Sequence, residues 1–149
     1  MKWILETVDD PWRGTNACSY AAKGNQFEIL KWLRAHGCPW DHDTCCSAAW
    51  NDNLDILIWL HENGCPWNEY SCRGAVKSKH LHVLKYLHEN GCPWDENTCL
   101  QANTDDHLDI LKYLHENGCP WNSEMYNKNS WCKQTEMFKY LYENGCPQA

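Results

Sequence analysis

A repeat of 27 residues constrains this sequence more than any other feature. The tripeptide Gly-Cys-Pro occurs five times in constant register, beginning at Gly37, Gly64, Gly91, Gly118 and Gly145. A second cysteine series and a tryptophan series keep the same step, at Cys18, Cys45, Cys72 and Cys99 and at Trp40, Trp67, Trp94 and Trp121. A fixed period of this length is the signature of a solenoid, in which each unit buries its apolar face only against its neighbours.

Each unit has the pattern of two short helices. Asp41 is a favourable N-cap, and Trp40 and Cys45 have the spacing of a hydrophobic staple around it. A second apolar helix is expected to begin near Leu54 and to end at Gly64, where glycine adopts the left-handed conformation that closes a helix. Because two helices and two turns fill the period, we predict an all-α protein, with the tryptophan series in its core.

The repeat resembles the ankyrin repeat over nearly the whole chain. The segment from Asn25 to Leu30 is similar to the start of that family's second helix, and Cys45-x-x-Ala48-Ala49 is similar to the Leu-x-x-Ala-Ala of its first helix. The units are about six residues shorter than the usual 33 and lack the β-hairpin finger. Hairpin-less units with a Gly-Cys-Pro-Trp turn resemble those in arrays of giant DNA viruses and some protists.

The resemblance implies a right-handed α-solenoid of stacked, ankyrin-like helix-turn-helix repeats. The chain is then one repeat domain, 1–149, made of an N-terminal half-repeat or cap, 1–12, four repeats, 13–39, 40–66, 67–93 and 94–120, and a C-terminal capping repeat, 121–149. It also implies a protein–protein interaction scaffold, in the cytoplasm, or in the host cytoplasm if the protein is viral.

Composition limits the classes of partner. The net charge of -7 opposes nucleic-acid binding, which requires a basic surface. No apolar run approaches the ~18 residues of a membrane span, and the acidic start MKWILETVDD is unlike a signal peptide. Eleven cysteines without a CxxC pair favour a reducing, intracellular environment over a disulfide scaffold. We therefore expect no nucleic-acid or membrane partner.

The recurring cysteines and histidines raise two chemical alternatives. His61 and Cys65 lie four residues apart, and the pair recurs as His88 and Cys92, yet a glycine turns the chain between them. A position that recurs in every repeat is more typical of packing than of a metal site or a catalytic constellation, which occurs once. We predict no catalytic residues, no metal, no cofactor and no enzymatic activity; a metal- or redox-responsive scaffold remains an alternative.

The first helices carry a stripe that differs in every repeat, whereas positions needed for stacking recur. In each repeat the variable positions lie at i, i+4 and i+7 of the first helix, so they share one side of that helix. Stacking of the repeats should align these sides on the concave surface of the solenoid. We predict that this surface binds a protein partner and that the protein is a monomer. Variability also fits positions that nothing constrains, as in a purely structural segment of a longer array, but the aromatic Trp50 favours binding. The predicted contact residues are Tyr20, Lys23, Asp43, Ser47, Trp50, Tyr70, Lys77, Gln101, Thr104, Glu124, Lys128 and Trp131.

Overall fold

The structure, a computed structural model, describes residues 16–127 and 135–148. Its helices follow one another along the chain as α1 (Ala17–Lys23), α2 (Phe27–Ala35), α3 (His42–Trp50), α4 (Leu54–Glu62), α5 (Glu69–Lys77), α6 (Leu81–Glu89), α7 (Glu96–Thr104), α8 (Leu108–Glu116), α9 (Glu124–Asn127) and α10 (Glu136–Glu143). No strand occurs within those two ranges. The predicted half-repeat, 1–12, lies outside the described residues, as does part of the C-terminal repeat.

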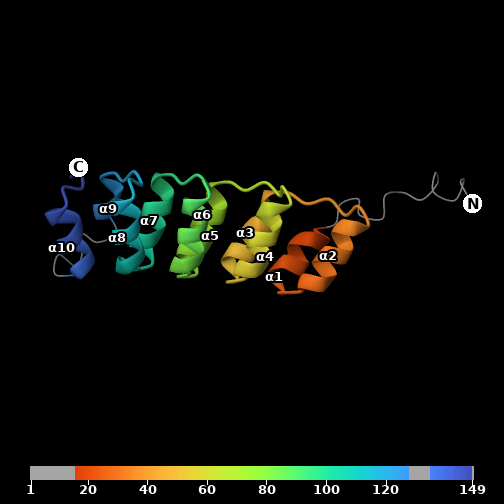
Figure 1. The fold of residues 1–149 in the computed structure, drawn as a ribbon. Coiled ribbons are helices and arrows are strands. Elements are labelled where there is room, and N and C mark those ends of the chain that lie inside the picture. Colours follow the sequence, from red (N-terminus) through yellow and green to blue (C-terminus); the bar gives the residue numbers. More distant parts are fainter. Residues whose placement is uncertain (1–15, 128–134, 149) are drawn as a thin grey trace, which may run out of the picture.

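The helices form an all-α solenoid, as predicted. Figure 1 shows the helix pairs arranged in chain order along one axis, from α1 and α2 at one end to α10 at the other. First helices of consecutive repeats pack closely, α1 on α3, α3 on α5 and α5 on α7, while consecutive second helices are in looser contact. The first helices therefore lie closer to one another along the stack than the second helices do.

Small residues allow the close approach of the first helices. Cys45, Ala48 and Ala49 of α3 are fully buried, and the equivalent Cys72 and Ala75 of α5 are buried as well. The second helices contribute the large side chains of the core, including Leu30, Leu57, Leu60, Leu84, Leu87, Leu111, Leu114 and Leu141. The first helices therefore bury small side chains and the second helices bury large ones.

The N-cap predicted at Asp41 is formed. The Asp41 carboxylate accepts a hydrogen bond from the backbone N–H of Asp43 at 3.0 Å, and Thr44 completes a capping box. The caps recur at Asn68, Asp95 and Asn122. In the last repeat, Thr135 replaces the leucine that begins other second helices, and its hydroxyl caps α10 by accepting from the N–H of Phe138 at 3.2 Å. Side-chain oxygens thus satisfy backbone donors that a helix start leaves unpaired.

Both turns of a repeat contain a left-handed residue. Gly64 has φ +78°, and its neighbour Cys65 donates a backbone hydrogen bond to the Leu60 carbonyl at 2.9 Å, which completes a Schellman motif. The sequence predicted this turn. It gave no sign that the turn between the first and second helices is also left-handed, at Asn25, Asp52, Lys79 and Asp106. Asn and Asp tolerate this conformation, whereas Lys79 is strained there.

Thiol hydrogen bonds close each repeat. The Cys65 thiol donates to the carbonyl of the N-cap Asp41 at 3.4 Å, and the Cys45 thiol donates to the carbonyl of Cys65 at 3.9 Å. In the last repeat, Tyr126 occupies the position that Cys45 and Cys99 have in earlier repeats, and its hydroxyl donates to the Cys146 carbonyl at 3.2 Å. The two cysteine series therefore join the beginning of a repeat to its end.

The tryptophan series lies at the edge of the core rather than inside it. Trp67 is half-buried, and its ring stacks on His61 at a centroid distance of 3.8 Å and an interplanar angle of 8°. Tyr86 of α6 meets the same indole edge-on at 6.4 Å. The indoles predicted to lie in the core are instead half-buried and pack against its edge, where histidine and tyrosine rings cover them between two repeats.

Candidate protein-binding face

The predicted contact residues that the structure describes lie on the outer faces of the first helices. Tyr20 and Trp50 are 70% and 44% exposed, and Tyr70 is 51% exposed. Ser47 and Gln101 are half-buried, so they contribute less accessible surface than expected. The remaining described members, all exposed, are Lys23, Asp43, Lys77, Thr104 and Glu124. Lys128 and Trp131 lie outside the described residues.

A groove of about 500 Å³ separates α1 from α3 on this face. Its walls include Tyr20 and Lys23 from α1 and Asp43, Ser47 and Trp50 from α3, five of the predicted residues. The stripe was derived from the variation between repeats, and the fold brings two of its sets together around one hollow. Two aromatic side chains on opposite walls give the groove the character of a site for an apolar anchor.

Cationic side chains lie over the aromatic rings beyond this groove. The Lys77 ammonium group is 4.9 Å from the centre of the Trp50 ring, and the Arg73 guanidinium group is 5.2 Å from the centre of the Tyr70 ring. Such cation–π contacts hold the rings in place at exposed sites with energies of ~0.5–1 kcal/mol. The aromatic surface therefore continues from α3 onto α5 with positive charge beside it.

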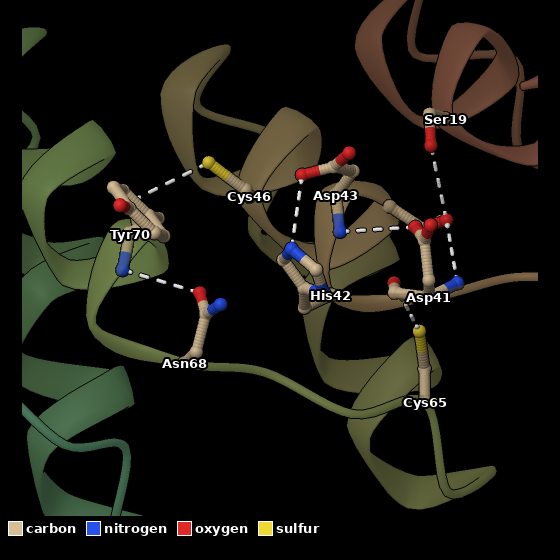
Figure 2. A network of polar contacts seen from close by, with 9 residues as sticks. Ser19, Asp41, His42, Asp43, Cys46, Cys65, Asn68 and Tyr70 are labelled. Carbon is tan, nitrogen blue, oxygen red and sulfur yellow. Dashed lines mark hydrogen bonds and ion pairs between the residues drawn. The ribbon is translucent and has the colours of Figure 1, made fainter.

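Helices α3 and α5 pack against each other at Gly74. The position is buried, and a β-carbon built there would lie 3.6 Å from the Trp50 β-carbon and 3.7 Å from the Cys46 sulfur. Figure 2 shows the Cys46 thiol directed at Tyr70, whose carbonyl accepts its hydrogen bond at 3.3 Å. This hydrogen bond therefore links α3 to α5 across the boundary between two repeats.

Sequence reasoning missed one row of the face. Ser19, Cys46 and Arg73 occupy equivalent positions of α1, α3 and α5, 27 residues apart, and Ser19 and Cys46 line the groove. These positions also differ between repeats, which is the signal that could have identified them. Ser19 additionally joins α1 to α3 through its hydroxyl, 3.1 Å from that of Thr44.

Raised pKa values hold the thiols of Cys18, Cys45 and Cys99 in the protonated form. Hydrogen bonding with Cys65, followed by burial, raises the pKa of the Cys45 thiol, and the same causes act on Cys99 through Cys119. Burial is the main cause that raises the pKa of Cys18 to about 12. A protonated thiol is a poor nucleophile and a poor metal ligand, so these groups act as buried hydrogen-bond donors.

The histidine of each His–Cys pair stacks on the indole that begins the next repeat. His88 stacks on Trp94 at 3.8 Å, and His115 stacks on Trp121 at 3.7 Å. Within residues 16–127 and 135–148, no three or more His, Cys, Asp or Glu side chains are grouped so that they could hold a metal ion. None of the described helices is long and apolar enough to cross a membrane.

Comparison with known proteins relates the chain to others by fold alone. No protein-family model matches the sequence, and no curated protein matches it. Among solved structures, it is similar to a chain in the structure of a predatory endopeptidase from Bdellovibrio bacteriovorus in complex with an immunity protein, with a TM-score of 0.66. The similarity covers 89% of this chain and 83% of that chain at 16% sequence identity.

Proposed function

We propose that this chain is a short-repeat, ankyrin-like protein that binds another protein through the outer faces of its first helices. The supporting observation is the groove between α1 and α3, with Tyr20 and Trp50 exposed on its opposite walls. Solenoids present extended binding surfaces on their concave side, and exposed aromatic side chains are characteristic of the centres of protein interfaces.

The tryptophan series and the single Trp50 differ in a way that supports the proposed binding face. Trp67 and its equivalents begin four consecutive repeats, at 40, 67, 94 and 121, and neighbouring rings cover them, as residues that hold repeats together should be. Trp50 occurs at a position occupied by Lys23 and Lys77 in the adjacent repeats and is 44% exposed. Stacking therefore does not require an indole at this position, and recognition of a partner supplies a reason for it.

The proposed setting is the cytoplasm, where the protein acts as a monomeric scaffold without chemistry of its own. The ten cysteines that the structure describes are free thiols, which fits a reducing compartment. Their hydrogen bonds within each repeat give them a structural role, so an enzymatic or redox function is not needed to explain them.

Site-specific photo-crosslinking tests the proposed binding face. A photoreactive amino acid is placed at Tyr20, and in a matched control at Tyr142, which is 64% exposed on α10. Both variants are expressed in cells and the crosslinked products are compared by mass spectrometry. We expect discrete protein adducts at position 20 that disappear when Trp50→Ala is added, and no such adducts at position 142. Equal adducts at both positions, or adducts insensitive to Trp50→Ala, would contradict the proposal.

A further inference from the structure

The N-terminal half of the binding face carries positive charge on an acidic protein. Helices α1, α3 and α5 contain Lys23, Arg73 and Lys77 against the two acids Asp43 and Glu69. The whole chain has a net charge of -7. The described parts of α7 and α9 carry acids and neither lysine nor arginine. The cations of the first helices are therefore concentrated around the groove and the Trp50 ring.

These cations have no ion-pair partner among the described residues, although Arg73 acts electrostatically on Asp95. In the described part of the chain, neither Lys23 nor Lys77 forms an ion pair, and Arg73 forms none either. The acid nearest to the groove, Asp43, has its carboxylate oxygen 3.4 Å from the ring of His42. Lys23 lines the groove on one side of Trp50, and Lys77 lies over the indole from the other side.

Taking the proposed binding function as its basis, we infer that the partner presents an acidic peptide segment with an apolar anchor residue. The anchor occupies the groove between Tyr20 and Trp50, and carboxylates on either side of it pair with Lys23 and Lys77. An arrangement of two cations flanking an aromatic ring selects this order of side chains, because a basic segment would meet uncompensated like charge.

The shape of the face fits an extended segment rather than a single small molecule. The groove lies between α1 and α3, and exposed aromatic side chains continue past Trp50 to Tyr70 of α5. Tyr20, Trp50 and Tyr70 thus form a row of exposed rings that crosses three consecutive first helices.

A phage-displayed library of random peptides, selected on the purified full-length protein, tests this inference. We expect enriched peptides to contain acidic residues on both sides of an aromatic or aliphatic residue. Synthetic versions of these peptides should bind about tenfold more weakly to the double variant Lys23→Glu/Lys77→Glu, because charge reversal across an interface is repulsive. Their affinity should also fall in high salt.

The matched control is Lys85→Glu/Lys112→Glu, which changes the net charge equally on the second helices, where both lysines are exposed. Circular dichroism checks that each variant is folded. Enrichment of neutral or basic peptides, or equal loss of binding in the two double variants, would overturn the acidic partner while leaving the binding face intact. Failure to enrich any peptide would overturn the peptide partner itself. Binding that survives Trp50→Ala would overturn both the inference and the proposed function.

Discussion

The same substitution, glycine to alanine, should have opposite effects at two positions of this solenoid. Gly64 closes α4 at φ +78°, and a β-carbon there would meet no atom within 4 Å. Gly74 lies inside α5, and a β-carbon there would make ordinary van der Waals contacts of 3.6–3.7 Å with Trp50 and Cys46. Steric clash is thus absent at both sites, and backbone conformation decides the sign of each effect.

The magnitudes follow from that conformation. At Gly64, the left-handed backbone costs an L-residue roughly 1–2 kcal/mol, so Gly64→Ala should lower the free energy of unfolding by about that amount. Gly64→Val should cost more, since a β-branched residue is more restricted at positive φ. At Gly74, alanine removes the entropic penalty of glycine in a helix and should raise the free energy of unfolding by about 0.5–1 kcal/mol.

Urea unfolding followed by circular dichroism measures both effects. With a slope of about 1–3 kcal/mol per molar urea, Gly64→Ala should lower the midpoint by roughly 0.3–2 M, and Gly74→Ala should raise it by a smaller amount. A Gly64→Ala variant as stable as the wild type would show that the turn is not left-handed. A destabilised Gly74→Ala variant would show that α3 and α5 approach more closely than described.

Three further outcomes test the repeat architecture by the same unfolding assay. Lys79→Asn should raise the free energy of unfolding by about 0.5–1 kcal/mol, because asparagine tolerates the left-handed turn, and an unchanged midpoint would argue against the strain. Tyr126→Phe should lower the free energy of unfolding by about 0.5–1.5 kcal/mol through loss of the hydrogen bond to the Cys146 carbonyl. An unchanged midpoint for this variant would show that the bond does not form. Deletion of residues 67–93 removes one repeat and brings Trp94 to the position beside His61, so the shortened protein should keep its helical content per residue and unfold cooperatively, though less stably. An unfolded or molten product would refute the solenoid.

Much of the fold could be predicted because each repeat provides a control for the others. Residues required by stacking recur every 27 positions, so the caps at Asp41 and its equivalents, the left-handed Gly64 and the buried Cys-x-x-Ala-Ala face could all be recognised. The variable stripe could be recognised for the complementary reason, and its members Tyr20 and Trp50 are exposed. These are local properties of one helix or one turn.

Contacts between repeats could not be derived in this way. The sequence shows that a tryptophan recurs at the position of Trp67 in four repeats. It does not show whether the indole is buried in the core or covered by His61 and Tyr86 at its edge. Nor does it show that Tyr126 replaces a cysteine thiol as the donor to the Cys146 carbonyl. Both facts depend on which side chains of successive units meet.

What the sequence alone determined, therefore, is the unit: two helices, their ends, their buried faces and the positions free to vary. Tertiary structure decided what happens where units meet. A groove lies between α1 and α3 beside Trp50, and the packing of α5 on α3 at Gly74 places Lys77 over the indole. Local propensity sets helix ends within a few residues of chain, whereas a groove and its charge arise from side chains on different helices, whose separation is set by packing across the whole interface.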